Sequence, residues 1–408
     1  MTIRNNRLLW ILAILALVAA ACSPSGGDAT TTTAGTTDDT EGATATTGGD
    51  DGGDDGGGAL PGEGVSINMG RANWASGYFQ AYVYQQVLQE LGYDISNPAD
   101  TELDPSLAYL AMAQGDIDFW VNSWYPGHGA WLEAELPDDS LVGDHVEGLG
   151  ASFAGGGIQG WLIEKDFADE FGVYTMEQFN SNADAIAAYD AEDPEPGNGI
   201  ADIYGCPESF TCDNIIQNMI AFGEWNNVAQ VIAGYDAMFA EAEDKVGDGI
   251  PAIIYTWTPT AYVAKLVPGV NVYWMGAETV LDDSNPAEQE GGAEHQQELG
   301  PTGATSFVAI PADQCPSAAD TDDGLCPMGW LPATVTPTAN STILEDNPVF
   351  EALLANLSLP VVDISLANFA ADQAGGSEET YNDLATEWIA NNRVIVDIAI
   401  ERAMVAAG

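Results

Sequence analysis

The sequence predicts an α/β protein with two lobes. Stretches in which apolar and polar residues alternate, as in a half-buried strand, are followed by stretches whose apolar residues recur every three or four positions, as on one face of a helix. This succession favours a sheet covered by helices. About 350 residues follow the first 60, more than one hydrophobic core usually serves, so two lobes are expected.

The first strand and the first helix are expected directly after the leader. Residues 65–69 alternate like a strand, and Ser76 is well placed to cap a helix that continues to Leu91. Gly92 suits the left-handed conformation with which many helices end, so we expect the helix to stop there.

Later elements follow from the same periods and from the turn residues between them. A glycine triplet at 155–157 precedes one strand, and Pro348 suits the first turn of a helix. The expected elements are a helix at 105–113, strands at 117–121 and 159–163, and helices at 167–171, 347–357 and 377–406. The polar segment 282–300 is expected to be a surface loop.

The N-terminal residues 1–21 have the pattern of a bacterial lipoprotein signal peptide. Two arginines precede an apolar run that is too short for a membrane span, and small residues lead to Cys22, which would carry the lipid. A plain secretory signal cut near Ala21 is the alternative. Residues 22–60, rich in Thr, Gly and Asp, cannot bury enough apolar surface to become ordered, so we expect a disordered tether. Both interpretations predict an exported protein.

The chain is strongly acidic, with 63 acidic and 8 basic residues and a formal net charge of −55. Such a balance excludes nucleic-acid binding, because the phosphates would be repelled. We interpret the acidity as an adaptation of the surface to salt, which screens the repulsion. An acidic surface shared by the exported proteins of one organism is the alternative.

Four of the five cysteines form two pairs that are close in sequence. We expect disulfides between Cys206 and Cys212 and between Cys315 and Cys326, because an exported protein folds in an oxidising compartment. Neither pair has the spacing of a zinc site. The acidic stretch 190–202 loosely resembles a calcium loop, but its prolines break the EF-hand pattern. We expect no metal and no cofactor, with calcium at this stretch as the open alternative.

Two tryptophan motifs and the cysteine loop between them carry the main functional signal. Trp124 in Asn-Ser-Trp-Tyr-Pro-Gly-His and Trp257 in Tyr-Thr-Trp-Thr-Pro each stand where a strand is expected to end, and Phe210 lies in the cysteine loop. Three such rings facing one another would enclose a cation that has no hydrogen-bond donors. Burial in the core is the alternative for each ring.

These motifs resemble those of ProX-type glycine betaine/proline betaine binding proteins, the OpuAC-like substrate-binding proteins of ABC importers. The matching segments are Leu60–Val65, Glu90–Tyr93, Gln114–Asp116, Trp124–His128, Cys206–Cys212, Tyr255–Pro259, Asn347–Pro348 and Leu359–Ile364. The resemblance covers residues 60–408 in order. It implies a two-lobed periplasmic-binding-protein fold of type II, cluster C-like. Lobe I would comprise 61–158 and 273–408, lobe II would comprise 159–272, and a hinge would join them beside a ligand cleft.

The same resemblance implies roles for individual residues. Trp124, Phe210 and Trp257 correspond to the aromatic box around a quaternary ammonium group. His128 and the backbone N–H groups of Thr211 and Cys212 correspond to the donors that hold the ligand carboxylate.

Some positions depart from the family member compared or lie outside its motifs. That protein has tryptophan and glycine where this chain has Phe210 and Thr211, and a phenyl face attracts a cation less strongly than an indole face. It also lacks an insertion like 282–329. Arg71 and Trp74 follow the first strand, where clefts often form, and are further candidates for the ligand site. A local salt bridge is the alternative for Arg71.

The expected function is capture of glycine betaine or proline betaine and delivery to the permease and ATPase subunits of an ABC importer. The protein is expected to be a monomer in the periplasm or at the outer face of the cytoplasmic membrane, held there only by its lipid. A receptor or sensor for another quaternary amine, such as choline or carnitine, is the alternative. An enzyme is disfavoured, because the chain has three histidines and no Gly-x-Ser-x-Gly elbow.

Overall fold

The computed structural model describes residues 59–277 and 306–406. The chain divides into two units, Met1–Leu60 and Pro61–Gly408, and the second contains all the elements described below. The expected signal peptide, the lipidated Cys22, nearly all of the expected tether and the loop expected at 282–300 lie outside the described residues.

A mixed sheet forms the centre of the described structure. Its strands run in the order β4-β2-β5-β14-β7-β10-β8-β9, with β11 paired to β7 and β6 paired to β14. The bounds are β2 Met69–Ala72, β4 Glu102–Leu103, β5 Phe119–Tyr125, β6 Val146–Gly148, β7 Phe153–Glu164, β8 Ala201–Tyr204, β9 Val228–Val231, β10 Ile253–Thr258, β11 Val272–Met275 and β14 Ala333–Asn340. Two small sheets pair β1 (Ser66–Ile67) with β3 (Asp94–Ile95) and β12 (Phe307–Val308) with β13 (Cys326–Pro327).

Strand β7 joins two halves of the main sheet. Near its start, Phe153 and Gly157 pair with β14, whereas the stretch from Ile158 to Glu164 pairs with β10 and β11. We call β4-β2-β5-β14 the first half and β10-β8-β9 the second half. Within each half, neighbouring strands β2 and β5, or β8 and β10, run parallel. Parallel neighbours need crossover connections, and helices supply them.

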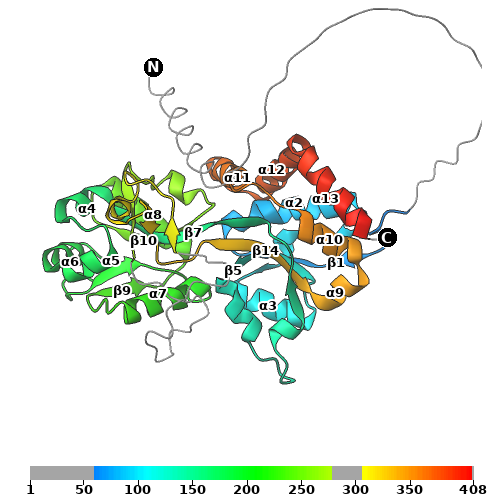
Figure 1. Cartoon of the computed structure of the whole chain (residues 1–408), viewed down its shortest axis with the longest axis horizontal. Helices are drawn as coiled ribbons and strands as arrows, with labels where there is room; N and C mark the ends of the chain where they lie inside the picture. The colour runs from blue at the N-terminus through cyan, green and yellow to red at the C-terminus, as the bar shows by residue number, and fades with distance from the viewer. Residues whose placement is uncertain (1–58, 278–305, 407–408) are drawn as a thin grey trace, which may run out of the picture. The chain divides into compact units, whose positions relative to one another are not determined.

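Helices gather around each half separately, as Figure 1 shows. The first half carries α2 (Tyr78–Glu90), α3 (Pro105–Gln114), α9 (Ser341–Asp346), α10 (Pro348–Asn356), α11 (Val361–Gln373), α12 (Glu378–Asn391) and α13 (Arg393–Ala406). The second half carries α4 (Lys165–Phe171), α5 (Met176–Ser181), α6 (Ala183–Asp190), α7 (Thr211–Phe222) and α8 (Tyr235–Gly247). The first half is therefore built from both ends of the ordered chain.

Most of the expected elements are present, with shifted ends. The helix expected at 105–113 is α3, and the one expected at 347–357 is α10, which begins at Pro348. Gly92 has the expected left-handed backbone, with φ of 91°. The strand expected at 65–69 is instead divided between β1 and β2.

The expectation that Ser76 caps the first helix is wrong. Ser76 lies in a 3-10 turn, Ala75–Gly77, and α2 begins only at Tyr78 with no side-chain cap. The Ser76 hydroxyl oxygen instead accepts a hydrogen bond from Trp257 Nε1 at 3.1 Å. A distant partner therefore uses the oxygen that a local cap would have used.

The single helix expected at 377–406 is also wrong, because the chain breaks between α12 and α13. Asn392 leaves the helical conformation, with φ of −117° and ψ of 31°. Its side-chain amide and its backbone N–H both donate to the carbonyl oxygen of Trp388. Asparagine often competes with the helix in this way, and the sequence period alone does not reveal it.

Within the described ranges, no single helix has the length and apolarity to cross a membrane. The bent pair α10 and α11 meets that test only when the two helices are taken together.

Arg71 ties β2 to β4 and to α12. Its side chain is 4% exposed, and its guanidinium pairs with Glu102 at 2.7 Å and with Glu378. The guanidinium also lies 3.7 Å from the centre of the Tyr78 ring. The donors of Arg71 are thus bound to protein carboxylates, which corrects the expectation that it holds a ligand carboxylate.

Arg71→Met is expected to lower the free energy of unfolding by roughly 2–3 kcal/mol, because it leaves two carboxylates without their buried partner. Affinity for the ligand should stay unchanged. Arg393→Met is the matched control. Arg393 is 40% exposed where it pairs with Glu90, so its loss should cost less than about 1 kcal/mol. Denaturant titration and calorimetry measure the two effects, and a loss of affinity in Arg71→Met would contradict the assignment.

Candidate functional site

A small cavity lies where the carboxyl ends of strands from both halves approach each other. Trp74 follows β2 and Trp124 lies near the end of β5, while Phe210 follows β8 and Trp257 lies near the end of β10. Parallel strands end at the same edge of a sheet, which is why residues so far apart in sequence meet. The cavity measures about 50 Å³, and its other lining residues are Pro105, Gly127, His128, Gln159, Thr211, Cys212, Ile215 and Tyr255.

Trp124 and Trp257 occupy matching places on their strands. Each is the last but one residue of its strand, and each is followed two residues later by a proline. The expectation that these motifs mark strand ends is confirmed. Both rings are nearly buried, at 8% and 5% exposure, yet both line the cavity.

The indole N–H groups of the cavity tryptophans are all bonded to oxygen atoms. Trp74 and Trp124 both donate to Asn122 Oδ1, at 3.0 and 2.8 Å, and Trp257 donates to Ser76 Oγ. The Trp257 ring is further supported by Tyr235, with ring centres 4.4 Å apart. These hydrogen bonds fix the N–H edges of the three indole rings.

The N-terminus of α7 forms the wall at the cysteine loop. Phe210 is the residue before the helix and makes no side-chain cap, and among the described residues no acceptor bonds the backbone N–H of Thr211 or Cys212. Cys206 and Cys212 are bonded, as expected, with Cα atoms 5.9 Å apart. The helix start therefore presents free N–H groups in a braced loop.

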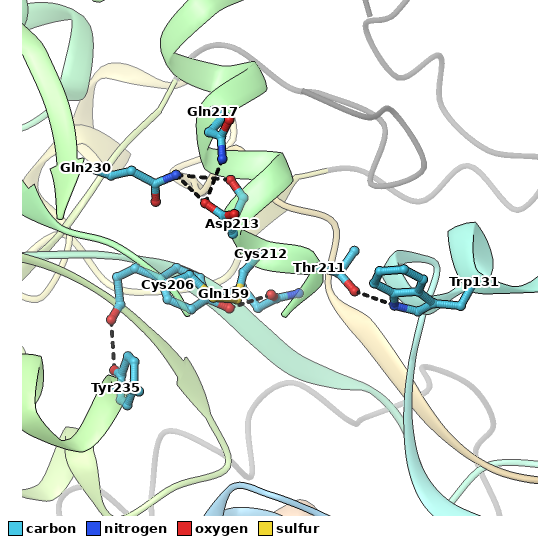
Figure 2. The surroundings of a disulfide bond; sticks show 10 residues. Trp131, Gln159, Cys206, Thr211, Cys212, Asp213, Gln217, Gln230 and Tyr235 are labelled. Atoms are coloured by element: carbon cyan, nitrogen blue, oxygen red, sulfur yellow. Dashed lines mark hydrogen bonds between the residues drawn. A yellow bond between two sulfur atoms is a disulfide. The ribbon is translucent and has the colours of Figure 1, made fainter. Parts of the chain in front are cut away.

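Figure 2 shows how the first turn of α7 is held. The Asp213 carboxylate accepts from Gln217 at 2.8 Å and from Gln230 at 2.6 Å, on the side of the helix away from Trp131. Trp131 donates its Nε1 hydrogen to Thr211 Oγ1 at 3.2 Å. Burial raises the pKa of Asp213. The helix start is thus anchored by side chains while its first N–H groups stay available.

His128 is a buried, neutral hydrogen-bond donor. Its Nδ1 accepts the backbone N–H of Trp124 at 3.1 Å, so the neutral ring carries its hydrogen on Nε2. The ring stacks on Trp120 with centres 5.7 Å apart. Burial lowers the pKa of His128 to about 3. The histidine can therefore offer an N–H without a charge.

Direct contacts join the two halves around the cavity. Trp131 bonds Thr211, Trp257 bonds Ser76, and the ring centres of Trp74 and Phe210 lie 5.1 Å apart. Lys265, which follows β10, also pairs with Asp372 at the end of α11, at 2.8 Å. The walls of the cavity therefore touch in places, while the cavity itself remains partly open.

The structure brings together most of the residues singled out from the sequence. Trp74, Trp124, His128, Phe210, Thr211, Cys212 and Trp257 all line the cavity, whereas Arg71 does not. Sequence reasoning missed Asn122, Gln159 and Tyr255. Asn122 lies inside the Asn-Ser-Trp-Tyr-Pro-Gly-His motif, in which only the tryptophan and the histidine were candidates. Tyr255 lies inside the second tryptophan motif, two residues before Trp257. Gln159, which accepts a 2.7 Å hydrogen bond from the Tyr255 hydroxyl, carries no local signal beyond its strand.

The acidic stretch 190–202 folds around its own backbone. Asp190 accepts the N–H groups of Gly197, Asn198 and Gly199, and Asp193 accepts two more. In the part of the chain that the structure describes, no group of three or more His, Cys, Asp or Glu is arranged to hold a metal. The second expected disulfide, between Cys315 and Cys326, is present.

Comparison with known proteins identifies the family. Residues 65–391 match the family described as the substrate binding domain of ABC-type glycine betaine transport systems. The chain belongs to this family. Its members are substrate-binding proteins of transport systems and not enzymes.

Two relatives align with this chain over most of their length. The chain is 27% identical to the glycine betaine/proline betaine-binding periplasmic protein of Escherichia coli K12, over 85% of this chain and 92% of that protein. It is 26% identical to the glycine betaine-binding periplasmic protein OusX of Dickeya dadantii, with the same coverage.

Solved structures show the fold. Lactococcal OpuAC, complexed with glycine betaine in a closed-liganded conformation, aligns with a TM-score of 0.54 at 16% identity, covering 82% of this chain and 99% of that chain. An ABC-transporter choline binding protein in complex with choline aligns with a TM-score of 0.56 at 15% identity, covering 84% and 98%. The fold is the two-lobed fold of periplasmic binding proteins.

Wild-type protein is expected to lose stability on acidification more steeply than His128→Asn. Between about pH 6.5 and about pH 3 the unfolded chain takes up a proton on this ring while the folded chain does not. Stability should therefore fall by about 1.4 kcal/mol per pH unit from this group alone. Denaturant unfolding of both proteins at about pH 7 and about pH 5 measures the difference, and equal slopes would contradict a buried neutral ring.

Proposed function

We propose that this cavity captures glycine betaine or proline betaine for an ABC importer. One observation carries the proposal. A cavity of about 50 Å³ has aromatic faces from both halves of the sheet and, beside them, the free N–H groups of a helix start and a neutral histidine. A small molecule with a methylated ammonium at one end and a carboxylate at the other fits both parts.

The aromatic walls suit a quaternary ammonium. That group spreads its charge over methyl hydrogens and has no N–H to donate, so it gains nothing from a hydrogen-bond acceptor. Ring faces offer negative potential without needing water, at about 0.5–2 kcal/mol per contact. Trp124, Phe210 and Trp257 supply these faces, and among the described residues no Asp, Glu, Lys or Arg lines the cavity. A carboxylate there would have to lose its own hydration first.

The donors suit a carboxylate. The first N–H groups of α7, at Thr211 and Cys212, lie at the positive end of the helix dipole, which attracts anions. His128 adds an uncharged N–H from the other half of the sheet. Backbone donors held by a disulfide need little reordering on binding, which favours affinity.

Transport follows from closure of two lobes on the ligand. We propose that 61–158 and 273–408 form lobe I and that 159–272 forms lobe II, since β7 changes its partner from β14 to β10 near residue 158. Strand β11 (Val272–Met275) departs from this division, because it pairs with the second-half stretch of β7. Ligand contacts from both sides would favour the closed state, which the permease and ATPase partners would recognise. We further propose that the protein is exported as a monomer and is held to the outer face of the membrane by a lipid at Cys22.

A receptor or sensor for choline or carnitine is the second candidate, because a choline binding protein shares the fold. The donors at Thr211, Cys212 and His128 favour a ligand with a carboxylate. Choline has none, so it would leave these donors unpaired.

Glycine betaine and proline betaine are expected to bind with micromolar affinity and to quench tryptophan fluorescence. Choline and proline should bind more weakly, since each lacks one of the two matched groups, and carnitine completes the panel. Trp257→Ala should abolish binding without unfolding the protein, because it removes one of the aromatic faces that contact the cation. Calorimetry with the five compounds measures this. Tight binding of choline alone would favour the second candidate, and unchanged affinity in Trp257→Ala would remove that ring from the site.

The two disulfides are expected to differ in what they support. Replacing Cys206 and Cys212 by serine should lower affinity about tenfold or more, because the donors of α7 would lose their brace. Replacing Cys315 and Cys326 is the control, with a stability loss of about 2–3 kcal/mol and unchanged affinity. Calorimetry and thermal unfolding of both double variants provide the comparison. Equal affinities would show that the brace is not needed.

A further inference from the structure

Asn122 lies at the polar edges of two cavity walls. Its Oδ1 accepts the indole N–H of Trp74 at 3.0 Å and that of Trp124 at 2.8 Å. An indole nitrogen can only donate, so the amide oxygen and not the amide nitrogen faces both rings. One atom therefore holds two rings, one from the segment after β2 and one from β5.

Asn122 is buried, and within the described residues only its oxygen is hydrogen-bonded. The side chain is 1% exposed, and among the described residues Nδ2 has no hydrogen-bond partner. An unpaired buried amide nitrogen costs free energy, which an apolar residue of similar size would avoid. The gain that offsets this cost is the pair of bonds at Oδ1.

Two glycines leave the space that this arrangement needs. A Cβ at Gly77 would lie 3.3 Å from Asn122 Cγ, and a Cβ at Gly157 would lie 2.7 Å from Trp124 Cζ3. Trp124 is thus held on one side by Asn122 and packed on the other side against the backbone of β7. Its ring has little freedom to turn.

We propose that Asn122 is a positioning residue of the ligand pocket, which orients Trp74 and Trp124 together so that both ring faces meet the cation. Trp74 becomes a fourth wall, beside the smaller ring of Phe210. A ring attracts a cation at its face and repels it at its edge, so a turned ring loses its contribution. This inference rests on the proposed function, because it assumes an onium ligand in the cavity.

The test compares two substitutions of similar size. Asn122→Leu removes the acceptor, whereas Asn122→Asp keeps an oxygen for both indoles. Asn122→Asp also replaces the amide nitrogen, which has no partner among the described residues, by an oxygen and brings a buried negative charge, so thermal unfolding first checks that this variant folds. Asn122→Leu should weaken glycine betaine binding at least about tenfold, and Asn122→Asp should stay within about threefold of wild type or bind more tightly. Calorimetry measures both. Unchanged affinity in Asn122→Leu, or equal losses in the two variants, would overturn the proposal.

Indole N–H signals in the NMR spectrum of tryptophan-labelled protein give a readout that needs no ligand. The signals of Trp74 and Trp124, assigned through their phenylalanine variants, should both shift in Asn122→Leu while the other indole signals stay in place. Unshifted signals would overturn the proposal. If the wild-type protein binds no onium compound, the proposed function fails, and the shifts still report whether Asn122 holds the rings.

Phenylalanine variants test the proposal if Asn122→Leu does not fold. Trp74→Phe and Trp124→Phe keep a ring face but lose the N–H, so each should weaken binding about threefold or more. Trp225→Phe is the control. Trp225 is 1% exposed, its Nε1 has no partner among the described residues, and it does not line the cavity, so affinity should not change. Full affinity in both cavity variants would overturn the proposal.

Discussion

The site depends on fixing the edges of aromatic rings so that their faces remain for the ligand. Trp74 and Trp124 are bonded to Asn122, Trp257 to Ser76, and Trp131 to Thr211. Each of these bonds favours one orientation of its ring, because turning the ring would break the bond. Two of these bonds, from Trp257 and from Trp131, also join the two halves of the sheet. The bond from Trp257 to Ser76 therefore both orients a ring of the lining and joins the two halves.

The cavity differs from the rest of the molecule in its charge. The chain has a formal net charge of −55, yet among the described lining residues only His128 changes its charge near neutral pH in water, and burial keeps it neutral. A cation is held there by ring faces and an anion by backbone dipoles. Most of the lining side chains are buried, so dissolved salt screens these contacts less than it screens the acidic surface.

The sheet explains why distant segments supply this lining. Strand β7 belongs to both halves, and the parallel strands on either side of it end at edges that face the cavity. Helix α7 follows β8 directly, so its free N–H groups start at the same edge. The positions of the aromatic residues and of the donors thus follow from the direction of the strands, as is usual for ligand sites in α/β sheets.

The sequence by itself determined the features that depend on neighbours along the chain. The alternation of strands and helices, the positions of α3 and α10 to within a residue or so, the two cysteine pairs and the place of both tryptophans near strand ends could all be predicted. Periodicity and turn residues act over a few positions, which is why these features can be predicted. The resemblance of the motifs then indicated which of these residues belong to one site.

Only the tertiary structure decided which distant groups become partners. Ser76 has the local pattern of a helix cap, but it bonds Trp257, 181 residues away. Arg71 has the position of a ligand residue, but Glu102 and Glu378 bind it. Asn122 gives no local sign that it holds two tryptophans. Each outcome depends on how strands and helices from separate parts of the chain pack together, and no local pattern contains that information.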